Sequence, residues 1–331
     1  MPPPKELCER LLSETKGFIT PTGFTGYPSE LGILQLREKI SEYYVRIGAC
    51  VQYDEIFITH GAKPAIGEII EVSNFTTALI ITPTYPLYEE LCAVNNIKVR
   101  FATLEQLKEI SSEKFDVIFL CSPNNPTGEM LDISIIGQFI DIASKNNATI
   151  ILDGAYADFS DNYFCPYLLK GSEKIIEVRT YSKNLCFTGI RCGYVVIKKQ
   201  NPFNEGYRRY LSLRSNGVNV ITQKTAIFSY HEAVESEVKK RAMEYRHKAD
   251  IIAKVLKKHN IKFSGGQNVP YLLCECKESG EKIFKELLYK MGVVVTPGEA
   301  FRANKHLRIS CFALEDEILM GAKLLDEYFS K

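Results

Sequence analysis

Between residues 56 and 153 the sequence alternates short apolar segments with longer amphipathic segments, and this pattern constrains the fold more than any other feature. The apolar segments have the composition of buried strands, and the segments between them have helical periodicity. A repeated strand–helix–strand order predicts a mostly parallel sheet with helices on both faces, which is an α/β fold. We expect strands at 56–59, 78–82, 98–102, 116–121 and 149–152, and helices at 61–72, from 86, and at 132–145.

The segments outside this core predict a second lobe. A largely helical stretch at 204–258 is long enough to link two lobes. We predict a large domain at 33–230 and a smaller α+β domain formed by 1–32 together with 231–331. The other expected elements are helices at 5–16, from 34 to about 48, at 280–290 and from 315, strands at 174–180, 194–197, 269–276, 293–295 and 307–310, and an irregular loop at 17–32.

The composition excludes several classes of protein. Of 331 residues, 45% are hydrophobic, which is enough for a sizeable core, and the formal net charge of +1 gives no basic surface for nucleic acid or membranes. No apolar run resembles a signal peptide or a membrane-spanning helix. The cysteines and histidines lack metal-ligand spacing, and no phosphate-loop, nucleophile-elbow or zinc-protease motif is present. We therefore expect a cytoplasmic protein with reduced thiols, no metal, and small molecules as its ligands.

Polar residues follow several of the predicted strands at their carboxyl ends. These residues are Gly61 to Lys63, Tyr85, Asn125 and Asp153. In open α/β sheets ligands bind at the edge where the carboxyl ends of the strands meet. We therefore expect these positions to converge at one rim of the sheet and to form a binding site there.

The segment from Thr180 to Tyr194 contains the strongest chemical signal. Lys183 lies in a loop between two predicted strands, close to the hydroxyl groups of Thr180 and Ser182, and it is followed by Arg191. An amine that attacks an aldehyde, beside cationic and hydroxyl groups that hold a phosphate, is what a Schiff-base cofactor requires. The alternative is that Lys183 and Arg191 are solvated surface charges, as most lysines and arginines are.

Asp153 ends an apolar strand, where a carboxylate needs a cationic partner such as a protonated pyridine nitrogen. The alternative for Asp153 is the capping of a following helix. Tyr156 and Asn125 can both donate a hydrogen bond to a phenolate oxygen on the same ring. Their alternatives are core packing for the tyrosine and turn formation for the asparagine.

Four further residues suit a phosphorylated ring and an acidic substrate. The backbone N–H groups of Ala62 and Lys63 open a predicted helix and can bind a phosphate. The ring of Tyr85 can stack on a flat cofactor or simply pack in the core. Arg308, on a predicted strand of the second lobe, can pair with a substrate carboxylate or with a surface acid.

Taken together and in order, these residues resemble the fold-type I, pyridoxal-phosphate-dependent aminotransferases of class I/II. The resemblance spans nearly the whole chain, and it implies a central parallel sheet in a large domain and a homodimer with shared active sites. The matching residues are Tyr27 with Gly32, Gly61-Ala62, Tyr85-Pro86, Asn125-Pro126-Thr127-Gly128, Asp153 with Tyr156, Thr180-Tyr181-Ser182-Lys183, Arg191 with Gly193, and Arg308-Ile309-Ser310.

The resemblance implies a role for each of these residues. Lys183 would bind the aldehyde of pyridoxal 5'-phosphate covalently and move a proton between the substrate α-carbon and the cofactor. Asp153 would pair with the pyridine nitrogen, Tyr156 and Asn125 would bind the ring oxygen, and Tyr85 would stack on the ring. Arg308 and Asn125 would contact the substrate, with Arg308 on its α-carboxylate. The phosphate would be held by Thr180, Ser182, Arg191, the backbone of Ala62 and Lys63, and Tyr27 of the neighbouring subunit.

Within this superfamily the sequence is most similar to the LL-diaminopimelate aminotransferases, in the segments Cys121 to Gly128 and Phe187 to Arg191. The substrate of that family carries a second amino-acid head. Its distal ammonium would need a carboxylate, for which Glu30 of the partner subunit is the candidate, and its distal carboxylate would need a cation, for which Lys63 is the candidate. The resemblance thus implies amino transfer from an amino acid to a 2-oxo acid such as 2-oxoglutarate, in lysine biosynthesis.

The sequence departs from that family at its start. The family has a longer N-terminal segment with an Ile-x-Leu-x-x-Gly-Asp-like stretch, and this sequence begins after that point, either as a shorter relative or because its start is missing. The alternatives that remain are a histidinol-phosphate-type aminotransferase, a pyridoxal-phosphate-dependent lyase or decarboxylase, and a catalytically inactive relative.

Overall fold

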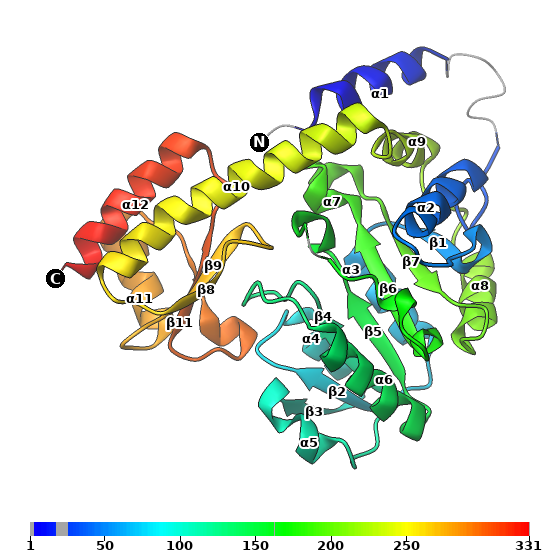
Figure 1. Cartoon of the computed structure of the whole chain (residues 1–331), viewed down its shortest axis with the longest axis horizontal. Helices are drawn as coiled ribbons and strands as arrows, with labels where there is room; N and C mark the ends of the chain where they lie inside the picture. The colour runs from blue at the N-terminus through cyan, green and yellow to red at the C-terminus, as the bar shows by residue number, and fades with distance from the viewer. Residues whose placement is uncertain (1–2, 18–25, 162, 331) are drawn as a thin grey trace.

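The computed structural model describes residues 3–17, 26–161 and 163–330. Within these residues the strands form two separate sheets (Figure 1). The larger sheet has seven strands in the order β1-β7-β6-β5-β4-β2-β3, and the smaller sheet has four in the order β10-β11-β9-β8. In the larger sheet β7 is antiparallel to both neighbours, while the other strand pairs are parallel. The predicted α/β fold with a mostly parallel sheet is confirmed.

The elements of the larger sheet form close to their expected residues. Its strands are β1 Ile56–Thr59, β2 Thr77–Ile81, β3 Lys98–Ala102, β4 Val117–Cys121, β5 Thr149–Asp153, β6 Ile175–Thr180 and β7 Gly193–Ile197. The helices in this part of the chain are α2 Leu34–Arg46, α3 Ala62–Val72, α4 Leu87–Val94, α5 Leu107–Ile110, α6 Ile133–Asn146, α7 Tyr181–Asn184, α8 Phe203–Arg214 and α9 Val220–Phe228.

Helices cover both faces of the larger sheet, which explains why strands such as β1 and β4 are buried, mainly apolar runs. Successive strand residues point to opposite faces, so Phe119 packs in the core under α3, α4 and α8, whereas Ile118 packs in the core under α6. The same alternation sends Ile58 of β1 toward α2 and α9. The polar residues of the site are therefore confined to the strand ends.

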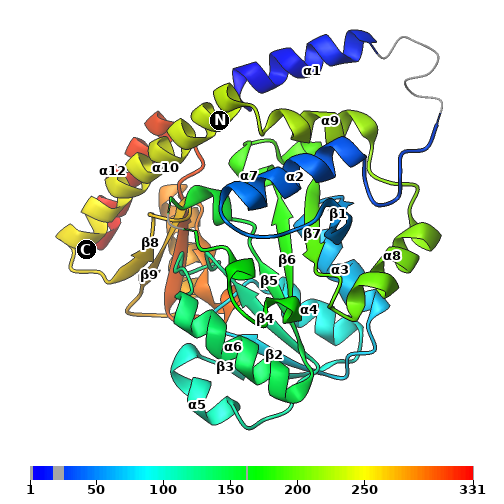
Figure 2. The ribbon, with the colours of Figure 1, turned by 45° about the vertical axis from the view of Figure 1, so that its right-hand side comes forward.

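The smaller sheet is antiparallel throughout. Its strands are β8 Phe263–Gly265, β9 Tyr271–Glu275, β10 Thr296–Pro297 and β11 His306–Ser310, and its helices are α10 Glu232–Lys258, α11 Gly280–Glu286 and α12 Glu315–Phe329. The helix α1, Lys5–Gly17, lies along the first part of α10, and α12 lies along its last part (Figures 1 and 2). The long helix α10 thus connects the two sheets.

Two predictions for the second lobe differ from the structure. The predicted strand at 293–295 is wrong, because the strand β10 starts only at Thr296. The N–H of Val293 still donates to the carbonyl of Leu287 at 3.1 Å, which holds this segment to the preceding helix, and Val294 is exposed. The strand β8 was not predicted, because three residues ending in glycine carry too little pattern.

We propose that the two sheets mark the domains predicted from the sequence, at 33–230 and at 1–32 with 231–331. The larger sheet and α2 to α9 fall in the first range, and the smaller sheet with α10 to α12 falls in the second. The helix α1 does not support its assignment to the smaller domain, because it contacts α9 as well as α10 and its Leu7 packs in the core that contains Leu36 and Ile40 of α2. In the described part of the chain, no helix is long and apolar enough to cross a membrane.

Candidate active site

Lys183 lies at the point where β6 ends. The backbone of Thr180 is extended, and its hydroxyl accepts a hydrogen bond from the N–H of Ser182 at 3.2 Å, so Thr180 caps the single helical turn α7. The prediction that Lys183 lies in a loop is therefore corrected: it lies on this turn, within the connection between β6 and β7. The turn aims Lys183 at the carboxyl ends of the neighbouring parallel strands.

A cavity of about 530 Å³ lies at this rim of the sheet. The predicted site residues that line it come from both lobes, since Arg308 belongs to β11 and the others belong to the larger sheet and its connections. These lining residues are Ala62, Lys63, Tyr85, Asn125, Asp153, Tyr156, Thr180, Ser182, Lys183, Arg191 and Arg308.

Asp153 is the buried acid of the cavity, with 5% of its surface exposed. Its Oδ2 accepts a hydrogen bond from the hydroxyl of Tyr88 at 2.7 Å, and its Oδ1 accepts one from the N–H of Ala155 at 2.9 Å. Burial raises the pKa of Asp153, while these two donors and the charge of Lys183 act in the opposite direction. The Asp153–Ala155 bond is local to the strand end, whereas the Tyr88 bond connects two distant elements.

Lys183 is the amine of the cavity. Its Nζ lies 5.6 Å from the ring centre of Tyr156 and 5.9 Å from that of Phe312. Burial lowers the pKa of Lys183, and the positive charges of Arg308 and Arg191 lower it further, while Asp153 raises it. A lysine with a lowered pKa is more often neutral, which is the nucleophilic form of the amine.

The groups suited to a phosphate lie together at one end of the cavity. The guanidinium of Arg191 donates from Nη1 to the hydroxyl of Ser182 at 3.3 Å and from Nη2 to the carbonyl of His60 at 3.1 Å. Gly61 has a φ of 106°, and a Cβ at this position would lie 2.8 Å from Nη2 of Arg191. Glycine thus allows Arg191 to approach the start of α3, where the N–H groups of Ala62 and Lys63 have no partner within the helix.

Arg308 approaches the cavity from the smaller sheet. Its Nη1 donates to Oδ1 of Asn125 at 2.8 Å, and its guanidinium lies 4.7 Å from the ring centre of Phe301. Among the described residues, its Nε is buried without a hydrogen-bond partner. A guanidinium with donors to spare, held against aromatic rings, suits a carboxylate ligand.

Two of the predicted residues do not line this cavity. Tyr27 is 83% exposed, and Glu30 is half-buried elsewhere on the surface. Their loop packs tightly against the turn after α8, because a Cβ at Gly217 would lie 2.6 Å from the carbonyl oxygen of Ser29. Neither residue therefore contributes to the cavity of its own chain.

Comparison with known protein families agrees with this geometry. The family described as aminotransferase class I and II matches residues 3–320. The chain belongs to this family. Its members are transferases of nitrogenous groups and typically use pyridoxal phosphate.

Individual relatives of this aminotransferase-family chain support the same placement. An LL-diaminopimelate aminotransferase of Desulfotalea psychrophila is 32% identical over 340 residues, which covers 93% of this chain and 83% of the relative. One from Prochlorococcus marinus is 30% identical over 356 residues, covering 96% and 86%. The solved L,L-diaminopimelate aminotransferase of Chlamydomonas reinhardtii matches with a TM-score of 0.89 at 26% identity, covering 99% of this chain and 88% of that one.

The residues present fit the cofactor that the family typically uses. The cavity supplies a buried carboxylate, an amine and a cluster of hydrogen-bond donors that can bind a phosphate. These three match the ring nitrogen, the aldehyde and the phosphate of pyridoxal phosphate. The close approach of Gly61 and Arg191 is also explained, because it places a cation beside the start of a helix.

Several residues that line the cavity of this aminotransferase-family chain were not singled out from the sequence, among them Leu87, Tyr271 and Phe312. Tyr88, which contacts Asp153, was missed as well. The sequence offered one signal for Tyr88, because it follows the predicted site residue Tyr85 by only three positions. Phe312 had no such signal, because the turn that follows β11 decides where its ring points.

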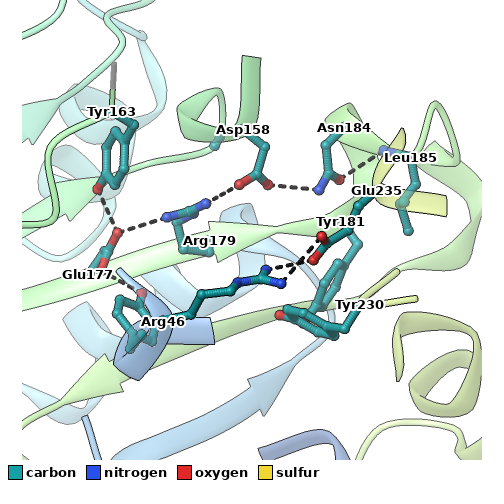
Figure 3. Close-up of polar contacts among 12 residues, drawn as sticks. Arg46, Asp158, Tyr163, Glu177, Arg179, Tyr181, Asn184, Leu185, Tyr230 and Glu235 are labelled. Atoms are coloured by element: carbon teal, nitrogen blue, oxygen red, sulfur yellow. Dashed lines mark hydrogen bonds and ion pairs between the residues drawn. The ribbon is translucent and has the colours of Figure 1, made fainter. Parts of the chain in front are cut away.

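A chain of polar contacts links the Lys183 turn to the rest of the larger sheet (Figure 3). Arg179 on β6 is buried and donates to Oε1 of Glu177 at 3.2 Å and also to Asp158. Asp158 accepts a second hydrogen bond, from the amide of Asn184 at 2.7 Å. Because Asp158 follows Tyr156 closely and Asn184 directly follows Lys183, this carboxylate connects two segments that line the cavity.

Proposed function

We propose that this protein is a pyridoxal-phosphate-dependent aminotransferase that moves an amino group between an amino acid and a 2-oxo acid, with glutamate and 2-oxoglutarate as one such pair. The observation that carries the proposal is the convergence of an amine of lowered pKa, a buried carboxylate and a guanidinium on one cavity. These groups are those of Lys183, Asp153 and Arg308.

Each end of the cofactor has matching groups in the cavity. Asp153 would hold the ring nitrogen, Asn125 and Tyr156 the ring oxygen, and Tyr85 would lie against the ring. The phosphate would bind to Thr180, Ser182, Arg191 and the backbone N–H groups of Ala62 and Lys63. When bound, pyridoxal phosphate supplies a protonated pyridine ring that accepts the electron pair released at the substrate α-carbon.

The residues of the chain provide the remaining chemistry. The amine of Lys183 would take the proton from the substrate α-carbon and return it to the cofactor side, as a base of lowered pKa can do near neutral pH. Burial raises the pKa of Tyr156 far above neutrality, so its hydroxyl stays protonated and donates. Arg308 would hold the substrate α-carboxylate and so orient the α-carbon toward Lys183.

The proposed substrate is LL-diaminopimelate or a similar amino acid with a second charged head. Lys63 lines the cavity and offers a cation for a distal carboxylate. Glu30 and Tyr27 would come from a partner subunit, Glu30 to meet a distal ammonium and Tyr27 to reach the phosphate. The proposal thus includes a homodimer with shared active sites, and its support is that neither residue lines the cavity of its own chain.

The test is a half-reaction with the purified protein and pyridoxal phosphate. We expect cofactor absorbance to appear on binding, borohydride to fix the cofactor on Lys183, and an amino donor to convert the bound cofactor to its amine form with release of the 2-oxo acid. A panel with glutamate, LL-diaminopimelate and histidinol phosphate as donors decides the substrate class. Release of ammonia or carbon dioxide without that conversion would indicate a lyase or decarboxylase, and a cofactor that no donor converts would indicate an inactive relative.

The role of Glu30 has its own test. Glu30→Gln removes the charge and keeps the size, so the preference for LL-diaminopimelate over glutamate should fall while the glutamate half-reaction stays unchanged. Glu38→Gln, on the exposed surface of α2, is the matched control. An unchanged preference in Glu30→Gln would remove Glu30 from the proposal.

A further inference from the structure

Tyr88 is buried beside the cavity but lies outside the set of residues assigned above. It lies on α4, and Tyr85 lies in the turn just before this helix, with the two ring centres 6.0 Å apart. Its other neighbour is Phe119 of β4, on which it stacks at 5.2 Å. The side chain is 1% exposed, so its hydroxyl needs a partner within the protein.

That partner is the carboxylate of Asp153. The hydroxyl of Tyr88 donates to Oδ2 at 2.7 Å, while the N–H of Ala155 occupies Oδ1. Burial and the nearby negative charge of Asp153 raise the pKa of Tyr88 well above its usual value, so the hydroxyl keeps its proton and remains a donor. Cys121 pairs with Asp153 across β4 and β5 and lies close to the same hydroxyl.

We propose that Tyr88 is a positioning residue that keeps the Asp153 carboxylate ionised and oriented toward the ring nitrogen of the bound cofactor. This inference rests on the proposed function and deepens it. Hydrogen bonds to a charged acceptor are stronger than those between neutral groups, so the Tyr88 bond favours the ionised carboxylate in a site where burial opposes it. An ionised carboxylate in turn favours the protonated pyridine ring, which is the form that withdraws electrons.

Loss of the Tyr88 hydroxyl would shift the balance within this pair. The proton would lie more on the carboxylate and less on the ring nitrogen. Without the Tyr88 hydroxyl, an ionised carboxylate beside a protonated ring is more costly in this buried site than a neutral acid beside a neutral ring. A ring with less positive charge makes the Nζ of Lys183, where it joins the cofactor, more basic. The other titratable groups around Asp153 stay in place, and they are Tyr85, Cys121, Tyr156, Lys183 and Tyr271.

The experiment compares Tyr88→Phe with Tyr207→Phe in the full-length protein. Tyr207 is a matched control, because it is also fully buried and its hydroxyl donates at 2.7 Å to a carboxylate, that of Glu68, which does not line the cavity. Both changes keep the ring and its packing. The measurements are the affinity for pyridoxal phosphate, the pH midpoint of the visible absorbance of the bound cofactor, and the thermal stability of the apoprotein.

We expect Tyr88→Phe to raise the pH midpoint by roughly one unit and to weaken cofactor binding about 10-fold, which is the size of one hydrogen bond to a charged group. Tyr207→Phe should lower thermal stability but leave both cofactor properties unchanged. In an Asp153→Asn background, Tyr88→Phe should have no further effect on the midpoint, because the carboxylate through which Tyr88 acts on the cofactor is absent.

Three results would overturn the inference: a wild-type midpoint and affinity in Tyr88→Phe, equal shifts in Tyr207→Phe, or an undiminished Tyr88 effect in the Asp153→Asn background. If the wild-type protein itself bound no pyridoxal phosphate, the proposed function would fail and this inference with it. That failure differs from the other three, because it is seen before any variant is made.

Discussion

Asp153 and Glu177 are two buried acids on the neighbouring strands β5 and β6, but the groups that compensate their negative charges differ. Glu177 is fully buried and pairs with Arg179 at 3.2 Å, and it also accepts from the hydroxyls of Tyr44 and Tyr163 at 2.7 and 2.6 Å. In the described part of the chain, the hydrogen bonds to the carboxylate of Asp153 come from two neutral groups, the Tyr88 hydroxyl and a backbone N–H.

The difference separates structure from chemistry. A buried acid with its own arginine is compensated within the chain and serves to hold elements together, as Figure 3 shows for the connection to Asp158 and Asn184. Asp153 faces a cavity and has a pKa raised by burial, so its negative charge gains most from a cation that a ligand brings. Removal of the arginine that compensates Glu177 should therefore destabilise the fold, whereas removal of the Asp153 charge should stabilise the apoprotein.

The largest effect is expected where the cavity loses its amine. Lys183→Ala should abolish covalent attachment of the cofactor and reduce transamination on the order of 10⁴-fold, because both the nucleophile and the proton carrier are removed. Borohydride reduction followed by peptide mass analysis measures the attachment, and single-turnover absorbance measures the rate. Lys174→Ala is the control, because this half-buried lysine before β6 lies outside the cavity and donates to Asn147 at 3.0 Å. Activity near the wild-type level in Lys183→Ala would show that Lys183 is not the reactive amine of the cavity.

Next in size is the compensated acid. Arg179→Met should destabilise the fold by about 3–5 kcal/mol, because Glu177 then stays buried without its cation. Equilibrium unfolding in urea gives the change in free energy. Tyr44→Phe removes only one neutral donor to the same carboxylate and should cost about 1 kcal/mol. A loss in Arg179→Met no larger than that of Tyr44→Phe would show that the arginine does not compensate Glu177.

A smaller effect, of opposite sign, is expected at Asp153. Its pKa is higher in the folded than in the unfolded chain, so the folded apoprotein holds the proton more tightly and its stability falls as the pH rises from the unfolded value through the folded one. Asp153→Asn should remove this fall and stabilise the apoprotein at neutral pH, by about 1.4 kcal/mol for each unit of pKa difference. Unfolding of both apoproteins over a pH series measures it.

Asp326 provides the control of opposite sign. Its partners Lys258 and His259 lower its pKa, so the stability that it contributes is present above the unfolded pKa and is lost as the pH falls through the lower, folded value. Asp326→Asn should therefore lose stability at neutral pH. Destabilisation of the apoprotein by Asp153→Asn as well would contradict the view that Asp153 lacks an internal cation.

The smallest effect is expected for an ion pair at the surface. Arg302 donates to both carboxylate oxygens of Glu89, but both side chains are more than one-third exposed. Glu89→Gln should change the free energy of unfolding by about 0.2–1 kcal/mol, and salt should reduce the effect. Thermal unfolding at low and high salt measures it. A loss of unfolding free energy as large as that of Arg179→Met would mean that solvent exposure does not weaken the Arg302–Glu89 pair relative to the buried Arg179–Glu177 pair.

Much of the fold followed from local pattern. Strands such as Ile56–Thr59 formed at the predicted residues because a run of buried apolar side chains between turn residues has few other stable arrangements. The errors lie where pattern is weakest, at the short strand Phe263–Gly265 and at 293–295, where contacts with the preceding helix override three valines. The site residues at strand ends were predictable because parallel strands bring their carboxyl ends to one edge.

The sequence by itself determined which chemical groups this chain carries and on which edge of the sheet most of them lie, since strand order and polarity are local properties of Lys183, Asp153 and Asn125. Only the tertiary structure decided the surroundings that set their chemistry. It placed the Tyr88 hydroxyl on Asp153, gave Glu177 its arginine, and left Tyr27 exposed and outside the cavity of its own chain. The physical reason is that burial and charge compensation depend on residues far apart in the chain, and no local pattern encodes them.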